Sequence, residues 1–286
     1  MSAAPTPPEP VTEIELDLLL DALKRRYHYD FRSYSRASLL RRAEVARHRL
    51  DCATLSELQG RLLRDPQVLH MLIDALTVQV SDLFRDPSHF RALRDEVVPY
   101  LRTFPSLKVW VAGCANGEEL YSLAILFAEE GLLDRTIFYA TEINRRALTK
   151  ASAGIYEISR LPGFSANYHQ AGGRGSLSDY YTAAYGGAAF HRDLRQRVVF
   201  SEHDLATDQV FSEVHLISCR NVMIYFDRNL QDRVVGLFQD SLVHGGFLGL
   251  GAHETLRFSA SSAAFTPFNE QERIWRRMTR PELSNA

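Results

Sequence analysis

The stretch from Leu107 to Gly131 constrains the fold of this chain more than any other. It begins with a short apolar segment, Val109 to Ala112, which is typical of a buried strand in a parallel sheet. A turn of small residues follows, and beyond it apolar side chains recur at the spacing of one helix face. This order predicts the first half of a βαβ unit, in which a nucleotide-like ligand can lie against the turn.

The residues of this turn indicate which ligand it would accept. A dinucleotide fold places pyrophosphate at the helix N-terminus, but this helix opens with Glu118 and Glu119, which suit the helix dipole and would repel phosphate. The spacing from Gly113 to Gly117 also differs from G-x-G-x-x-G. The turn therefore favours a ligand without phosphate there, such as the cation S-adenosylmethionine. The alternative is an ordinary turn with two capping glutamates.

An acidic residue, Glu142, ends the next predicted strand, which runs from Thr136 to Thr141. It follows Gly117 by 25 residues (142 − 117), enough for one helix and one strand. A carboxylate in this place can accept hydrogen bonds from ribose hydroxyls. The alternative is a role at the N-terminus of the helix that begins at Arg145. The two acidic strand ends together favour an adenosyl site.

Composition bounds the class of protein. A chain of 286 residues with a net charge of −2 can bury an α/β core and a smaller domain. No apolar run approaches the ~20 residues of a membrane span, and the N-terminus lacks a secretory signal pattern. Three cysteines without a C-x-x-C spacing argue for a reducing compartment. We expect a cytoplasmic protein without direct membrane insertion.

Four segments are predicted from changes in pattern along the chain. Residues 1–12 are expected to be a disordered leader, 13–76 a helical domain, 77–105 a linker region, and 106–286 the α/β domain. Helical periodicity predicts helices over Glu13–Tyr27, Arg36–Leu50, Thr54–Arg64 and Pro66–Leu76, with caps at Thr12 and Ser35.

A basic segment lies within the predicted helical domain. Lys24 to Arg49 contains nine basic and two acidic residues, a local charge of +7. An apolar stripe on its second helix predicts that the arginines point outward and form a patch for an acidic partner. A solvated surface is the alternative, and nearby aromatic residues resemble packing more than a nucleic-acid platform. The candidate partner-binding residues are Arg36, Arg41, Arg42, Arg47 and Arg49.

Beyond Ala151 the pattern changes to short strands and loops. Gly163–Gly175 reads as an irregular loop, and a hairpin is predicted around Gly186 and Gly187, with a third strand over Gln196–Phe200. These elements predict a small antiparallel β-subdomain at about 177–200. It is either a loop elaboration or an edge that docks a partner strand.

Asp204 follows the strand Val198–Phe200, where a polar side chain can hydrogen-bond an adenine edge. His191 and His203 nearby raise the alternative of a metal site, but their spacing is unconvincing, and we predict no metal. Cys114 and Cys219 stand at strand ends near the ligand. A small side chain where backbone meets ligand explains both better than a nucleophile does, because neither has a histidine partner.

Three stretches, VWVAGCANGEELYSLAI, ATEI with GIY downstream, and ISCRNVMIYFD, resemble in this order the CheR family of chemoreceptor glutamate O-methyltransferases. LTVQVSDLFRD, FLGLGAHETL and YDFRSYSRASLLRR add to the resemblance, which covers about Tyr29 to Met278. It implies a class I S-adenosylmethionine-dependent methyltransferase fold. This fold has a Rossmann-like, mostly parallel seven-stranded sheet, an N-terminal all-α domain and an inserted antiparallel β-subdomain. The implied reaction methylates receptor glutamates and releases S-adenosylhomocysteine.

The resemblance also implies roles for single residues. Arg85 and Tyr225 match the positions given catalytic weight, with a surface ion pair to Asp82 or Asp86 and simple packing as the respective alternatives. The family usually has Asn, Thr and Asp at the positions of Gln79, Ser81 and Glu142. With Gly113 from the turn, the expected cofactor contacts are Gln79, Ser81, Arg85, Gly113, Glu118, Glu142, Asp204, Leu205, Arg220 and Asn221.

The implied partner is the cytoplasmic helical region of methyl-accepting chemoreceptors, which family members touch through the arginine-rich helix. In some members the β-subdomain also grips a tethering pentapeptide at the receptor C-terminus. The hairpin here is shorter than in those members, so we predict independence from the peptide. Two alternatives stay open: a methyltransferase for RNA or a small molecule, and a non-catalytic cofactor-binding adaptor.

Overall fold

The computed structural model describes residues 10–257 and 259–278, and these form two compact units. The first unit reaches to Val78 and includes Tyr225–Leu230 from later in the chain. The second holds Gln79–Ile224 and the chain from Gln231 onward. The predicted leader lies mostly outside the described residues. No helix among the described residues is both long and apolar enough to span a membrane.

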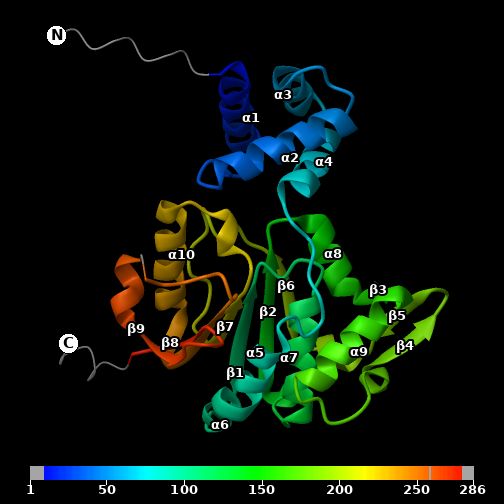
Figure 1. Cartoon of the computed structure of the whole chain (residues 1–286), viewed down its shortest axis with the longest axis vertical. Helices are drawn as coiled ribbons and strands as arrows, with labels where there is room; N and C mark the ends of the chain where they lie inside the picture. Colours follow the sequence, from blue (N-terminus) through cyan, green and yellow to red (C-terminus); the bar gives the residue numbers. More distant parts are fainter. Residues whose placement is uncertain (1–9, 258, 279–286) are drawn as a thin grey trace. The chain divides into compact units, whose positions relative to one another are not determined.

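The first unit is helical, as its periodicity predicts. Leucines on the inner faces are buried, and the Thr54 hydroxyl accepts the N–H of Glu57 at 3.1 Å to cap the third helix. Pro10 precedes the first helix, so the predicted cap at Thr12 is wrong. The helices are α1 (Val11–Tyr27), α2 (Arg36–Arg49), α3 (Leu55–Arg64) and α4 (Pro66–Leu76) (Figure 1).

The second unit is built on a seven-stranded sheet in the order β6-β2-β1-β7-β8-β10-β9. The strands are β1 (Leu107–Ala112), β2 (Thr136–Glu142), β6 (Val198–Glu202), β7 (Val214–Cys219), β8 (Leu242–Leu250), β9 (Phe265–Asn269) and β10 (Ile274–Arg277). β10 runs antiparallel to both its neighbours, whereas β6, β2, β1, β7 and β8 pair in parallel. The predicted mostly parallel seven-stranded sheet is confirmed.

Helices cover both faces of this sheet. Val109 and Val111 of β1 face a core shared with the helices α5 (Pro87–Ala92), α7 (Glu118–Glu129), α8 (Arg145–Ala153) and α9 (Leu161–Gln170) (Figure 1). On the opposite face Trp110 packs edge-on against Phe238 of α10 (Arg228–Ser241). The core therefore has the two helical layers of a doubly wound fold.

The predicted linker 77–105 is corrected by this packing. Its residues form α5, a π-helical turn (Leu93–Val97) and α6 (Val98–Leu101). Phe84, Phe90 and Val97 are each fully buried in the core of the second unit. The change of pattern near residue 77 does mark a boundary, but the residues beyond it belong to the α/β unit.

A buried ionic cluster closes the C-terminal end of α7. Glu129 pairs with Arg94 and accepts the hydroxyl of Tyr168 and the N–H of Arg174. Burial alone would raise the pKa of Glu129, but these hydrogen bonds and the guanidinium outweigh it and lower the pKa below its ordinary value. The ionised carboxylate is therefore the form that stabilises the fold.

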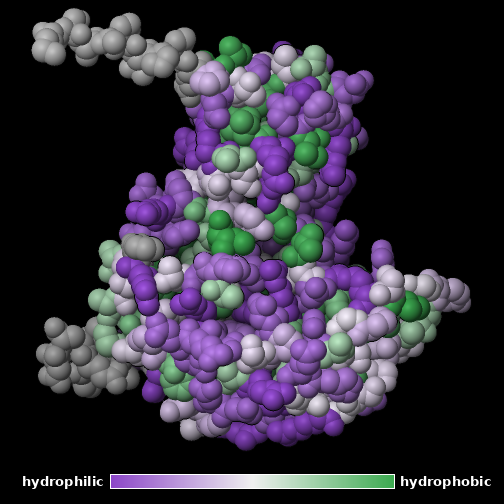
Figure 2. Space-filling view, in the orientation of Figure 1, coloured by the Kyte–Doolittle hydropathy of each residue, from purple (hydrophilic) through white to green (hydrophobic). Residues whose placement is uncertain are grey.

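The small antiparallel sheet has the order β3-β5-β4 and contains the predicted hairpin. Its strands are β3 (Ile155–Glu157), β4 (Tyr181–Ala184) and β5 (Gly187–Phe190). Tyr185 and Gly186 link the last two with positive φ. The third strand is β3, so the prediction that Gln196–Phe200 joins this sheet is wrong: β6 pairs with β2 instead. Figure 2 shows apolar surface here, where Ile155 and Ile158 are exposed.

Two further expectations are wrong for a common reason. Gly163–Gly175 is largely the helix α9, because Leu161, Phe164 and Tyr168 all face the core. The sequence pattern also predicts a helix over Arg228–Val243 that stops at Gly245 and Gly246, but strand β8 runs through both glycines. In both places tertiary packing overrides the low local propensity of glycine.

Candidate functional site

Four of the predicted cofactor contacts lie at or just beyond the carboxyl ends of parallel strands. Gly113 follows β1, Glu142 ends β2, Asp204 follows β6 and Asn221 follows β7. The chain winds from β1 toward β2 and β6, then returns to place β7 on the other side of β1. Ligands of open α/β sheets bind at such a switch point, so this edge is the candidate site.

The turn after β1 needs its glycines. Gly113 and Gly117 have φ of 72° and 95°, which side chains rarely adopt. The N–H groups of Gly113 and Cys114 both donate to the carbonyl of Thr141 at 2.9 Å, which ties the turn to β2. A Cβ on Gly113 would stand 2.7 Å from Cγ2 of Val222. The turn is thus held from both neighbouring strands.

Glu142 is buried beside this turn, where the ribose-binding prediction places it. Its carboxylate accepts the N–H of Ala115 at 2.9 Å and the N–H of Asn144 at 3.1 Å. Burial raises its pKa, while these N–H groups and a hydrogen bond with the Gln79 side chain act in the opposite direction. The structure fixes the carboxylate, and its contact with a ribose stays a prediction.

Three buried acceptor atoms around the turn have no hydrogen-bond donor among the described residues. They are Oε2 of Glu118, Oε1 of Gln79 and Oδ1 of Asn116. Glu118 is fully buried, and burial raises its pKa although Arg160 bonds its other oxygen at 2.7 Å. Buried acceptors are normally satisfied. An ammonium group carries three donors and a positive charge, so these residues fit S-adenosylmethionine.

Arg160 is a site residue that sequence reasoning missed. Besides Glu118, its guanidinium bonds the carbonyl of Ser81 and the carboxylate of Asp82, the latter at 3.1 Å. It also lies over the ring of Phe164, 4.6 Å from the centroid. Arg160 thereby joins the start of α9 to the segment that carries Ser81. No spacing signal in the sequence links it to Glu118.

Arg85 stands on a strained backbone. The residues on either side, Phe84 and Asp86, have φ of 51° and 56°, a region that costs non-glycine residues roughly 1–3 kcal/mol each. The N–H of Phe84 donates to Oγ of Ser122 at 2.7 Å, and the Arg85 carbonyl accepts Nη2 of Arg220 at 3.0 Å. Such strain persists only where neighbours hold it, and here both flanks of Arg85 are held.

The guanidinium of Arg220 is occupied by protein partners, whereas a cofactor contact would need a guanidinium that is open to the ligand. It forms ion pairs with Glu119 at 2.9 Å and Asp86 at 2.8 Å, and its side chain is 2% exposed. Nη1 of Arg220 is taken up by Glu119, and Nη2 bonds Asp86 and the Arg85 carbonyl. Direct contact of Arg220 with the cofactor stays a prediction.

The alternative reading of Arg85 as a surface ion pair is wrong. Asp86 pairs with Arg220 and Asp82 with Arg160. Among the described residues the Arg85 guanidinium has no acidic partner, and the side chain is only half-buried. It is a cation available for an incoming anion.

The remaining predicted contacts lie on the loops after β6 and β7. Asp204 and Leu205 are buried, and Oδ1 of Asp204 accepts the N–H of Ala206 at 2.8 Å. Asn221 has a φ of 61°, and its N–H donates to Glu254 at 2.9 Å. His203 packs on Trp110. Within residues 10–257 and 259–278 no group of three or more His, Cys, Asp or Glu residues is placed to hold a metal.

Tyr225 belongs to the first unit, with its ring 4.9 Å from the guanidinium of Arg42 and its carbonyl accepting the N–H of Ser35 at 2.7 Å. Arg85 belongs to the second unit. Joint action of Arg85 and Tyr225 on a substrate stays a prediction.

The expectation that the five arginines of the basic helix all point outward is wrong for three of them. Arg36 pairs with Glu13 and Asp17, Arg42 bonds the carbonyl of Leu76, and Arg47 bonds the carbonyls of Cys52 and Ala53 beyond the helix. Their guanidinium groups tie α2 to its surroundings. Only Arg41 and Arg49 of the five are exposed.

Cysteine nucleophiles are not favoured by their surroundings. Cys114 and Cys219 are 1% and 0% exposed, and burial raises the pKa of each thiol well above its ordinary value. Their thiolate forms are therefore disfavoured.

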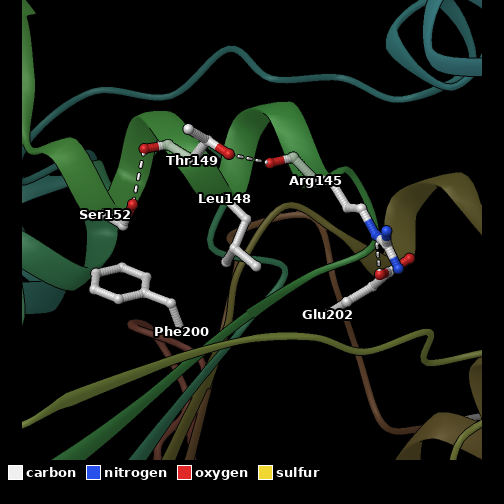
Figure 3. Close-up of a pocket in the computed structure, with 6 residues that line it drawn as sticks. All are labelled: Arg145, Leu148, Thr149, Ser152, Phe200 and Glu202. Atoms are coloured by element: carbon white, nitrogen blue, oxygen red, sulfur yellow. Dashed lines mark hydrogen bonds and ion pairs between the residues drawn. The ribbon is translucent and has the colours of Figure 1, made fainter. Parts of the chain in front are cut away.

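A shallow pocket lies beside the predicted site, between α8 and the edge strand β6 (Figure 3). It is lined by Arg145, Leu148, Thr149, Ser152, Phe200 and Glu202. Arg145 and Glu202 form an ion pair across it, and none of the predicted cofactor contacts lines it. Its charges already neutralise one another, so it suits a cation less well than the turn at Glu118.

Two family models together match most of this chain. The model of the CheR methyltransferase SAM binding domain matches residues 79–274, and that of the CheR methyltransferase all-alpha domain matches residues 14–77. A protein of Pseudomonas putida named as methyltransferase Cher3 is 54% identical over 93% of this chain and 97% of its own length.

Relatives named chemotaxis protein methyltransferase are more distant. The Listeria innocua protein is 28% identical over 86% of this chain and 92% of its own length. Chemotaxis protein methyltransferase 2 of Pseudomonas aeruginosa is 33% identical over 71% of this chain and 70% of its own length. The chain therefore belongs to the CheR methyltransferase family, and S-adenosylmethionine is its cofactor.

Proposed function

We propose that this methyltransferase transfers the methyl group of S-adenosylmethionine to glutamate side chains on the cytoplasmic helical region of methyl-accepting chemoreceptors. Relatives that carry the name chemotaxis protein methyltransferase support a chemoreceptor substrate. A substrate region on the cytoplasmic side would place the enzyme in the cytoplasm. The observation that carries the proposal is the half-buried Arg85, which lacks an acidic partner among the described residues and can pair with an incoming carboxylate.

A glutamate substrate needs no general base. Its unperturbed pKa is about 4.3, so the carboxylate is ionised at neutral pH and is already a nucleophile. The cofactor supplies an electrophilic methyl group on a sulfonium. Carboxylate and sulfonium become ester and thioether, so charge disappears as the reaction proceeds. A strong ion pair would stabilise the reactants more than the transition state, and the task of the protein is alignment, worth roughly 7–11 kcal/mol.

Different residues of this chain bind and align the different groups of cofactor and substrate. Glu118 and Gln79 present acceptors to the ammonium end of the cofactor, and Glu142 presents a carboxylate to the ribose. Arg85 orients the substrate carboxylate from a backbone that Ser122 and Arg220 hold in place. Tyr225 fixes the carboxylate or lines the sulfonium. S-adenosylhomocysteine leaves as the product.

The exposed arginines Arg41 and Arg49 are the proposed receptor contacts, because an acidic helical surface complements them. The hairpin turn of Tyr185 and Gly186 is short, which supports independence from a receptor pentapeptide. Calorimetric titration with an Asn-Trp-Glu-Thr-Phe peptide tests this last point, and measurable binding would contradict it.

The decisive experiment incubates the protein with methyl-labelled cofactor and purified cytoplasmic receptor fragments, with RNA and small-molecule acceptors in parallel. We expect label on receptor glutamates that mild base releases as methanol. Arg85→Ala and Tyr225→Phe are expected to lose turnover, and cofactor binding is measured for both variants in parallel. Arg257→Ala, which removes an exposed arginine paired with Glu270, is the matched control. Label only on RNA or a small molecule, or full turnover in both variants, would refute the proposal.

A further inference from the structure

The carboxylate of Glu254, just beyond β8, is 4% exposed and surrounded by backbone N–H groups. Its Oε1 accepts the N–H groups of Val222 and Met223 at 2.9 and 2.7 Å. Its Oε2 accepts those of Asn221 and Gly251 at 2.9 and 2.6 Å. One side chain thus binds three consecutive residues of the loop after β7 and one residue at the end of β8.

This arrangement determines the shape of the loop. Asn221 has a φ of 61°, and successive N–H groups around such a residue converge on an anion. Without the carboxylate, those N–H groups would lose their acceptor in a place largely shielded from water, which is unfavourable. The strands also leave little room: a Cβ on Gly251 would stand 2.8 Å from the N and Nδ2 atoms of Asn221.

We infer that Glu254 is a positioning residue that sets the loop after β7 so that the Asn221 side chain meets the cofactor. The inference rests on the proposed role of Asn221 as a cofactor contact. In these four hydrogen bonds Glu254 binds only backbone, so it acts on the cofactor through the loop. The loop after β7 leads directly into the short helical turn Met223–Tyr225.

The chemistry of the four bonds dictates the test variants. Glu254→Gln keeps the size of the side chain, but its amide N–H₂ would face two N–H donors in place of an acceptor. Glu254→Asp keeps the charge and both oxygens and shortens the reach. Glu270→Gln makes the same chemical change at an exposed carboxylate and is the matched control.

The experiment measures binding of S-adenosylmethionine by calorimetry and steady-state methyl transfer, both well below the melting temperature of each variant. For Glu254→Gln we expect the Kd and the KM for cofactor to rise at least tenfold. For Glu254→Asp we expect a smaller rise, and for Glu270→Gln none. Gly251→Ala perturbs the same loop from the other side and is expected to weaken cofactor binding as Glu254→Gln does.

The outcomes separate the inference from the proposed function. If Glu254→Gln and Glu254→Asp melt earlier yet bind cofactor like the wild type, Glu254 is only structural and the inference is wrong. If Glu254→Gln does not fold, cofactor binding is measured on Glu254→Asp and Gly251→Ala, and wild-type binding in both would refute the inference. Normal cofactor binding in Asn221→Ala would refute the contact on which the inference depends. Failure of the wild type to methylate receptors would refute the proposed function and leave the binding result intact.

Discussion

Ser122 offers a direct test of the claim that Arg85 stands on a backbone held under strain. Its side chain is fully buried, and Oγ accepts the N–H of Phe84 and donates to the carbonyl of Glu118, each at 2.7 Å. Ser122→Ala removes both bonds. The Glu118 carbonyl keeps the N–H of residue 122 within α7, so that loss is minor. The Phe84 N–H, however, becomes a buried donor without an acceptor, which costs about 1–3 kcal/mol.

We therefore expect Ser122→Ala to lower the free energy of unfolding by about 1–3 kcal/mol. Because Phe84 has a φ of 51°, the segment is expected to relax and displace Arg85. A displacement near 1 Å can reduce a rate by about 100-fold. The fall should appear in kcat for methyl transfer, with little change in the KM for cofactor.

The unfolding assay can be confined to the relevant unit. Both tryptophans, Trp110 and Trp275, lie in the second unit, so a urea titration followed by tryptophan fluorescence reports on it alone. Ser159→Ala is the matched control, because Ser159 is exposed and bonds only the exposed Glu157 among the described residues. A stability change under about 0.5 kcal/mol, the range of neutral surface substitutions, with unaltered kcat would refute the reasoning.

Four further predictions concern stability, reactivity and docking. The folded pKa of Glu129 is below its unfolded value, so the stabilisation it contributes is present above the unfolded pKa and is lost as pH falls through the folded pKa. In urea titrations between pH 7 and 3, Glu129→Gln should therefore reduce the fall of the unfolding free energy with falling pH. Trp110→Ala should cost about 3–5 kcal/mol in calorimetric melting, because the indole is fully buried. Cys114 should resist alkylation in mass spectrometry until urea unfolds the protein, and rapid native labelling would contradict its burial. Arg41→Ala should weaken receptor methylation without altering the melting temperature, whereas Arg36→Ala, which breaks ion pairs to α1, should lower that temperature.

The sequence made the sheet and its cofactor edge predictable because their signals are local. The apolar strand Val109–Ala112, its glycine turn and the helix beyond are consecutive, and each has its own periodicity. The same holds for Glu142 at the end of the next strand. The predictions for helix α9 and for the glycines of β8 are wrong, because long-range packing determines their conformation and a local window carries no record of it.

The support around the site was beyond prediction for a related reason. Arg160 meets Glu118 across 42 residues, Ser122 meets Phe84 across 38, and Glu254 meets Val222 across 32. Arg160, Ser122 and Glu254 are polar, and each would read as a surface residue in its own segment. Only the folded chain brings these groups out of water and makes their pairing necessary.

Tyr156 connects the small antiparallel sheet with the turn after β1. It lies in β3, an edge strand of the small sheet, yet its hydroxyl donates to the carbonyl of Asn116 at 2.8 Å. The same hydroxyl oxygen lies 3.2 Å from the place that a Cβ on Gly117 would occupy. A strand added along the open side of β3 would restrain this tyrosine, and with it the cofactor turn. Thermodynamic linkage makes such an effect mutual: if the added strand changes the affinity for cofactor by some factor, bound cofactor changes the affinity for the strand by the same factor.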